Sequence, residues 1–204
     1  HKHNIYDTYF KMQKKIKLIF FHPFSNIGGA DNSLRKLIER LDMKKYSITF
    51  VTLNNSFLKK RLNTNILFKK LNAKRTLFSI FELKRLIKRY ERFKTFKKII
   101  LISNQNFANI VSSLAVLNNK RVKKILIDRN HIDELSFNKN IWENIKQNII
   151  KILMKYTYRN ADLVIGISKK LSFDLSQFIG KKVQTIYSPG YDKEILNLAK
   201  KKIH

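Results

Sequence analysis

Two adjacent glycines, Gly28 and Gly29, stand between an apolar segment and a strongly periodic segment, in a 204-residue chain with only five glycines. Glycine has no Cβ, so the backbone there can approach a ligand closely or adopt a positive φ. The first N–H groups of a helix are unpaired and carry partial positive charge, which suits a phosphate. The pair therefore indicates a phosphate-binding loop, with a ligand-free tight turn as the alternative. Its spacing matches neither the dinucleotide fingerprint GxGxxG nor a P-loop.

Several kinds of chemistry have no support in the residues. The chain contains no cysteine, which excludes a disulfide framework and thiolate chemistry. No D-x-D motif is present, and histidines and carboxylates do not cluster at metal-ligand spacing, so no metal or other cofactor is expected. No uninterrupted apolar run approaches the length that crosses a bilayer.

The charge is strongly positive: 43 Lys and Arg face 14 Asp and Glu, for a net charge of +29. Such a field attracts polyanions, including nucleic acid, anionic lipid and phosphorylated substrates. The alternative is a compositional bias toward lysine on solvated faces, which would carry no function.

Short apolar segments alternate with helical periodicity along the chain. Strands are predicted at 15–21, 47–53, 66–71, 98–103, 122–128, 161–168 and 182–188. Runs such as LIFF, IILI and LVIGI are apolar at every position, as in strands that are buried on both faces. This pattern predicts a Rossmann-like, doubly wound α/β domain with a mainly parallel sheet and helices on both faces.

The helices carry their own signals. Leu34, Leu37, Ile38 and Leu41 form one apolar stripe, and Ser79 with Glu82 matches a capping box. Ser168 is placed to cap a helix that begins at Lys169. One face of a long predicted helix carries the apolar residues Ile141, Ile145, Ile149, Ile152, Leu153 and Tyr156.

In order and spacing, the segments IGGADNSLRKLIERL, ADLVIGISKKLSFDL and VQTIYSPGYDKEIL resemble the N-terminal domain of GT-B glycosyltransferases, most closely the retaining family 4. The resemblance spans about Lys15 to Leu196. It departs from the family pattern at Asp31, where glutamate is more usual, and at Ser188, where asparagine usually precedes the proline.

The resemblance implies roles for individual residues. Gly28 and Gly29 would face the cleft near the donor diphosphate and the acceptor. His131 would lie beside the transferred sugar as the catalytic residue, with a surface histidine as the alternative. Arg129 could meet a phosphate, or be one more basic surface residue. Ser168 matches a family serine, although helix capping explains it fully.

The resemblance also implies a domain organisation. Residues 1–14 would be an N-terminal extension, 15–188 the GT-B N-terminal domain, and 189–204 the start of an inter-domain linker. The paired glutamates with which the family's C-terminal domain binds the nucleotide are not found at their spacing in this sequence. We therefore expect this piece to be inactive without a C-terminal domain.

The expected reaction transfers a sugar from a nucleotide-sugar to a saccharide or lipid-linked acceptor in surface-glycan biosynthesis, with no bound metal. A basic segment with interleaved apolar residues, 68–98, could lie on anionic lipid, which would place the protein at the cytoplasmic face of a membrane. An ordinary sheet-covering helix is the alternative for that segment. Two other functions stay open: the acceptor-binding or membrane-anchoring subunit of a two-chain glycosyltransferase, and a charge-driven nucleic-acid binder that lacks a recognisable RNA or DNA module.

Overall fold

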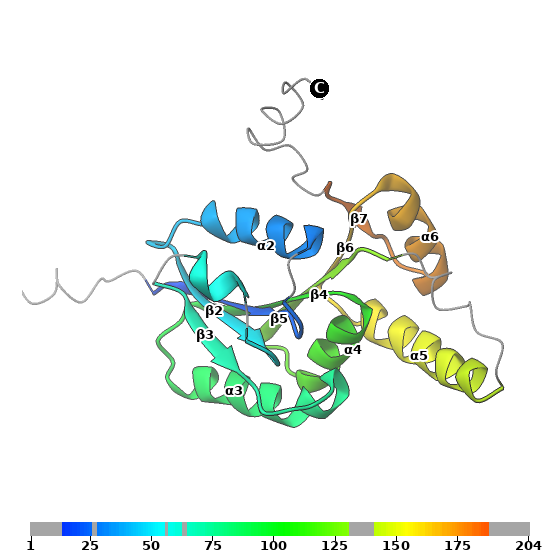
Figure 1. The fold of residues 1–204 in the computed structure, drawn as a ribbon, viewed down its shortest axis with the longest axis horizontal. Coiled ribbons are helices and arrows are strands. Elements are labelled where there is room, and N and C mark those ends of the chain that lie inside the picture. Colours follow the sequence, from blue (N-terminus) through cyan, green and yellow to red (C-terminus); the bar gives the residue numbers. More distant parts are fainter. Residues whose placement is uncertain (1–13, 26–27, 56, 63–64, 131–140, 188–204) are drawn as a thin grey trace, which may run out of the picture.

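The computed structural model describes residues 14–25, 28–55, 57–62, 65–130 and 141–187. Within them, seven parallel strands form one sheet in the order β3-β2-β1-β4-β5-β6-β7 (Figure 1). The strands are β1 (Ile16–Phe21), β2 (Tyr46–Thr52), β3 (Leu67–Lys70), β4 (Lys98–Asn104), β5 (Val122–Asp128), β6 (Leu163–Gly166) and β7 (Gln184–Thr185). The predicted α/β class and all seven predicted strand positions are confirmed.

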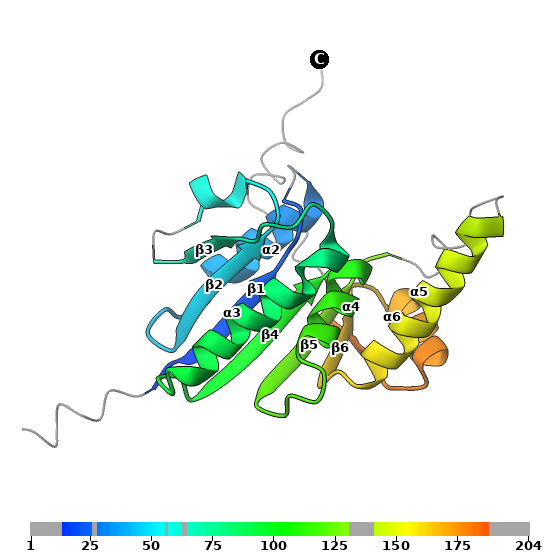
Figure 2. The same cartoon turned by 90° about the horizontal axis from the view of Figure 1, so that it is seen from below.

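Helices cover both faces of the sheet, as predicted. The described helices are α2 (Gly29–Glu39), α3 (Ile80–Arg92), α4 (Asn106–Ala115), α5 (Ile141–Arg159) and α6 (Lys169–Ile179), with short 3₁₀ turns η1 (Phe57–Lys60) and η2 (Thr76–Ser79). Helix α2 lies on one face. Helices α3, α4 and α5 lie side by side on the other, and α6 packs against α5 (Figures 1 and 2).

The two faces of β1 bury alternate side chains, which explains its unbroken apolar run. Leu18 and Phe20 pack with α2, whereas Ile19 and Phe21 pack with α3 and α4. A third cluster joins α4, α5 and α6 around Tyr158. Because strands of this kind are buried on both sides, their sequence shows no alternation.

The chain reverses its winding direction between β1 and β4. The strands β2 and β3 lie on one side of β1, and β4 begins the other half of the sheet. In open parallel sheets, ligands bind outside the carboxyl ends of the strands at such a switch point.

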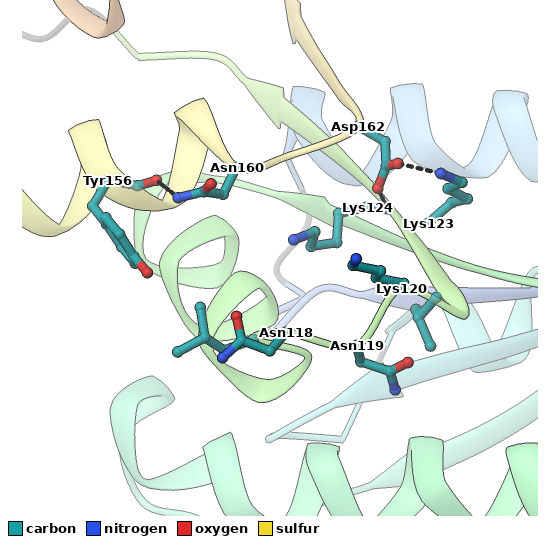
Figure 3. A pocket seen from close by; sticks show the side chains of 10 residues that line it. Asn118, Asn119, Lys120, Lys123, Lys124, Tyr156, Asn160 and Asp162 are labelled. Carbon is teal, nitrogen blue, oxygen red and sulfur yellow. Dashed lines mark hydrogen bonds and ion pairs between the residues drawn. The ribbon is translucent and has the colours of Figure 1, made fainter.

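At the opposite edge of the sheet, a pocket of about 390 Å³ is lined by Lys120, Lys124 and Tyr156 among others (Figure 3).

One predicted helix signal is wrong. Ser79 is the residue before α3, but its hydroxyl donates to the Thr76 carbonyl at 2.6 Å and makes no cap bond to the helix. The Glu82 carboxylate instead accepts from the backbone N–H of Asn72 at 2.8 Å. The capping box does not form because both side chains bind backbone groups of the segment that leads into α3.

The long apolar face predicted for 141–156 exists in α5, but most of it faces away from the protein. Ile141, Ile152 and Tyr156 are exposed, while the buried side of α5 is formed by Met154, Thr157 and Tyr158. The first turns of α5 extend away from the rest of the ribbon in both views (Figures 1 and 2). Among the described residues, no helix combines the length and the apolar character needed to cross a membrane.

Candidate active site

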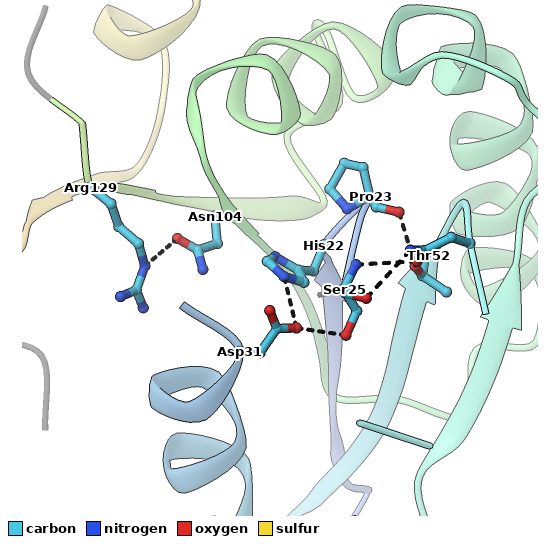
Figure 4. Close-up of polar contacts among 8 residues, drawn as sticks. His22, Pro23, Ser25, Asp31, Thr52, Asn104 and Arg129 are labelled. Atoms are coloured by element: carbon cyan, nitrogen blue, oxygen red, sulfur yellow. Dashed lines mark hydrogen bonds and ion pairs between the residues drawn. The ribbon is translucent and has the colours of Figure 1, made fainter. Parts of the chain in front are cut away.

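Polar side chains gather at the carboxyl ends of β1, β4 and β5, where the topology predicts a ligand site. The segment after β1 contains His22, which is fully buried, and Ser25. Both reach Asp31 in the first turn of α2: the Ser25 hydroxyl donates to Asp31 Oδ1 at 2.6 Å, and His22 Nε2 lies 3.3 Å from the same oxygen. Figure 4 shows these three side chains converging. This buried cluster fixes the start of α2 against the end of β1.

The same segment is tied to the neighbouring strand. The Thr52 hydroxyl and the Leu53 N–H both donate to the Pro23 carbonyl, at 3.0 and 2.7 Å. The Ser25 N–H donates to Asn54 Oδ1 at 3.2 Å. Pro23 has no N–H to donate, but it lies beyond the last residue of β1, Phe21, so the sheet loses no hydrogen bond there. The described residues 22–25 are therefore anchored both to α2 and to the end of β2.

The two glycines stand at the start of α2 with open space beside them. Gly28 is the N-cap residue with φ −144°, an extended conformation, and no side chain caps the helix. A Cβ placed on either glycine meets no heavy atom within 4 Å. The positive φ that the sequence allowed is therefore not used at Gly28. Within the described residues, neither crowding nor strain accounts for this pair, and the ligand-binding role predicted for it stays a prediction.

Arg129 brings a cation to the same edge. Its Nε donates to Asn104 Oδ1 at 2.8 Å, which links the end of β5 to the end of β4 (Figure 4). Burial lowers the pKa of Arg129, and the negative charge of Asp31 opposes that shift. An arginine with this high intrinsic pKa stays protonated. The structure thus brings Arg129 into the electrostatic neighbourhood of Asp31 in the first turn of α2, and its binding of a phosphate stays a prediction.

A buried hydrogen-bond network holds the backbone of Arg129. Asp128 is fully buried; its Oδ1 accepts from the Arg129 N–H at 2.8 Å and its Oδ2 from the Tyr158 hydroxyl at 3.0 Å. Tyr158 in turn accepts from Asn109 Nδ2 at 2.8 Å, and Asn109 Oδ1 accepts from the Ser103 hydroxyl. Burial, followed by the charge of Asp128, raises the pKa of Tyr158 well above its usual value, so the phenol stays protonated and donates.

Ser168 serves as the predicted helix cap. Its hydroxyl accepts from the Leu171 N–H at 3.2 Å, and its backbone is extended as an N-cap residue requires. It lies at the same edge of the sheet as Arg129, because it follows β6. The remaining predicted residue, His131, lies outside the described residues, as do residues 188–204, which contain the predicted end of the domain and the predicted linker.

No individual role in the site was predicted from the sequence for His22, Asn104, Asp128 or Asp31. Each of the first three comes at or directly after the end of a predicted strand. Because the carboxyl ends of parallel strands share one edge, that position was a usable signal.

Comparison with known proteins decides the family. The sequence profile of glycosyltransferase family 4 matches residues 27–192, most of the chain. The chain belongs to glycosyltransferase family 4. The predicted resemblance is thereby confirmed. No curated protein sequence matches the chain.

Solved structures agree on the fold. A protein from Listeria monocytogenes assigned as a UDP-N-acetylglucosamine 2-epimerase superposes with a TM-score of 0.56 at 13% identity, covering 93% of this chain and 50% of its own. A ugt transferase from Siraitia grosvenorii in complex with UDP gives 0.56 at 12%, covering 90% and 54%. A sucrose-phosphate synthase from Thermosynechococcus elongatus gives 0.55 at 12%, covering 90% and 94%. The chain spans about half the length of the first two, and its sheet is that of a GT-B N-terminal domain.

Proposed function

We propose that this chain is the acceptor-side domain of a retaining glycosyltransferase that moves a sugar from a nucleotide-sugar to a saccharide or lipid-linked acceptor in surface-glycan biosynthesis. The observation that carries the proposal is the uncapped start of α2, with open space at Gly28 and Gly29, beside the Arg129 guanidinium. Membership of family 4 supports glycosyl transfer in general.

The site residues divide the work by their chemistry. The first N–H groups of α2 and the Arg129 guanidinium stabilise the negative charge that develops on the departing diphosphate. Asp128 and Asn104 hold Arg129 in position through hydrogen bonds at 2.8 Å. His131 lies beside the transferred sugar, where an imidazole can accept or donate a proton near neutral pH. A second domain binds most of the nucleotide, so this chain alone does not turn over, and the transfer needs no bound metal.

The proposed setting is the cytoplasmic face of a membrane. The predicted membrane segment 68–98 contains α3, whose Leu83 and Ile87 are buried against the sheet, as the sheet-covering alternative requires. Its outward side keeps the basic residues Lys84, Arg85 and Lys88 exposed. Exposed lysines and arginines at this density support attraction to anionic lipid.

The test of the transfer site is Gly29→Val in the chain joined to a nucleotide-binding second domain. Because a Cβ at Gly29 meets no described atom within 4 Å, valine is tolerated by the fold and occupies the ligand space instead. We expect the rate at which nucleoside diphosphate is released from the donor to fall about a hundredfold or more, with an unchanged melting temperature. His131→Ala should lose activity in the same assay, and chelation by EDTA should not.

The matched control is Arg121→Val, which introduces the same side chain at an exposed position on the opposite edge of the sheet. It should keep full activity. Full activity in Gly29→Val would remove the α2 start from the site, and loss of activity in both valine variants would show a nonspecific effect.

A further inference from the structure

Helix α5 is apolar on two sides, and only one of them is covered by described residues. Met154 and Tyr158 are fully buried against the protein. The outer side carries a continuous apolar stripe, which at 100° per residue spans a little over a quarter of the helix circumference. Its members are Ile141 (74% exposed), Trp142 (72%), Ile145, Ile149, Ile152 (69%) and Tyr156. We call these six residues the α5 stripe. A contiguous exposed apolar patch of this kind marks an interaction surface.

Basic residues border the α5 stripe along both sides. By helical geometry, Lys151 and Lys155 flank it on one side and Lys146 on the other, and Arg159 closes its carboxyl end. Glu143 is the only acidic residue of α5, and it lies on the far side of the helix from the stripe. An exposed apolar stripe with a border of lysines is the pattern of helices that lie in the plane of an anionic membrane surface.

The carboxyl end of the α5 stripe opens into the basic pocket of Figure 3. Tyr156 and Asn160 of this end line the pocket together with Lys120 and Lys124 from the loop and strand beside it. Asp162, the carboxylate in the lining, is bound by Lys123 at 2.7 Å. Burial lowers the pKa of Lys124; Asp162 opposes the shift, and Lys181 and Lys123 add to it. Unbalanced positive charge in a pocket favours an anionic group there.

The occupant must combine an apolar body with negative charge. A second copy of this chain would bring another +29 charge to the contact, which opposes association. Nucleic acid supplies the negative charge, but it has little apolar surface with which to cover the isoleucines of the α5 stripe. A bilayer that contains anionic lipid supplies acyl chains for the stripe and phosphate groups for the lysines.

We propose that α5 lies in the surface of an anionic membrane, with the α5 stripe among the acyl chains and a lipid phosphate group in the pocket of Lys120 and Lys124. This proposal names the contact surface for the membrane association proposed above and rests on that part of the proposed function alone. In this proposal α5, and not the segment 68–98, is the element that enters the apolar layer of the membrane. The proposal does not depend on the sugar-transfer reaction.

Trp142 provides a direct probe, because it is the single tryptophan of the chain and is 72% exposed. The intact chain is mixed with vesicles of phosphatidylcholine with or without phosphatidylglycerol. We expect phosphatidylglycerol vesicles to shift Trp142 emission to the blue and to protect it from acrylamide quenching. Inorganic phosphate without vesicles should leave the emission unchanged, which separates lipid phosphate from the free ion.

Two pairs of variants assign the contact to its parts. Ile145→Ser with Ile152→Ser should weaken vesicle binding about tenfold or more, since each isoleucine loses its burial in the acyl layer. The fold tolerates both changes, because both side chains are exposed. Leu37→Ser, at an exposed apolar position in α2 on the opposite face of the sheet, is the matched control and should bind normally. Lys120→Gln with Lys124→Gln should weaken binding about tenfold to phosphatidylglycerol vesicles only. Lys44→Gln with Lys59→Gln is the control pair.

Each remaining outcome overturns the proposal in a recognisable way. Vesicle binding without a change at Trp142 would keep the membrane association and remove α5 from it. An absence of vesicle binding would remove both, and would leave the Gly29→Val test of the transfer site untouched. A concentration-dependent blue shift without vesicles would show that a second copy covers the α5 stripe.

Discussion

At the scale of single residues, the buried charged side chains of the described residues lie in two places. One is the site edge, where Asp31 and Asp128 organise the start of α2 and the Arg129 backbone. The other is Lys17 in β1, which is 3% exposed and far from that edge. The Lys17 amino group donates to Ser47 Oγ at 3.1 Å and lies 4.4 Å from the centre of the Tyr90 ring. These contacts only partly replace water around the charge.

Lys17 leads to a prediction on pH. Burial lowers its pKa from 10.5 to about 8, so between these pH values the unfolded chain binds more protons than the folded one. Its contribution to stability therefore rises with pH across this window. Lys17→Met should raise the free energy of unfolding at pH 7 by about 1–3 kcal/mol, and this gain should shrink as the pH increases from 8 to 10.5. Denaturant titrations at several pH values measure it.

Lys15→Met is the control for this effect, because Lys15 directly precedes β1 and is exposed, so its replacement should not raise the free energy of unfolding. A gain in Lys17→Met that stays constant up to pH 10.5 would contradict the titration argument and point to packing instead.

At the scale of elements, the sequence predicts the positions of the strands more reliably than it predicts which faces of the helices are buried. The unbroken apolar run of β1 has one physical explanation, burial on both faces. The apolar periodicity of 141–156 does not indicate what the apolar face packs against, and in the structure most side chains of the α5 stripe are exposed. Likewise, the Ser79–Glu82 spacing could not reveal that the Asn72 N–H would take the glutamate.

The site divides in the same way. Gly28, Gly29 and Arg129 could be proposed as ligand-facing residues from the sequence, because a glycine pair before a helix and a cation after a strand are local patterns. The contact of His22 with Asp31 depends on how the loop after β1 returns across the end of the strand, and the Asp128–Tyr158 bond joins residues thirty positions apart. No local pattern encodes such meetings.

The cap of α6 gives a prediction at this scale. Ser168→Ala removes the acceptor of the Leu171 N–H and should lower the free energy of unfolding by about 1 kcal/mol. If capping is its whole role, the KM for acceptor and donor stays unchanged in the complete enzyme. The control is Ser112→Ala in α4, where the buried hydroxyl finds no hydrogen-bond partner among the described residues and its loss should not destabilise the fold. A raised KM with unchanged stability would instead make Ser168 a substrate-binding residue.

At the scale of the whole molecule, the net charge of +29 acts on the folded state itself. Like charges on a compact body repel one another, and salt screens this repulsion over about 10 Å at 0.1 M. We therefore expect the melting temperature to rise with sodium chloride, which thermal scans at constant pH will show. Sucrose at equal osmolality is the control for general solvent effects. A melting temperature that falls with salt would mean that specific ion pairs such as Lys123–Asp162 outweigh the repulsion.

The Tyr158 hydroxyl has a mechanical consequence. Tyr158 belongs to α5, and its bond to Asp128 runs directly to the backbone of Arg129. A tilt of α5 is therefore passed through Tyr158 and Asp128 to the backbone N–H of Arg129, one residue from the hydrogen bonds that end β5. Helix α5 thus carries the exposed α5 stripe on its outer side and, on its buried side, the Tyr158 hydroxyl that belongs to the hydrogen-bond network of the candidate site.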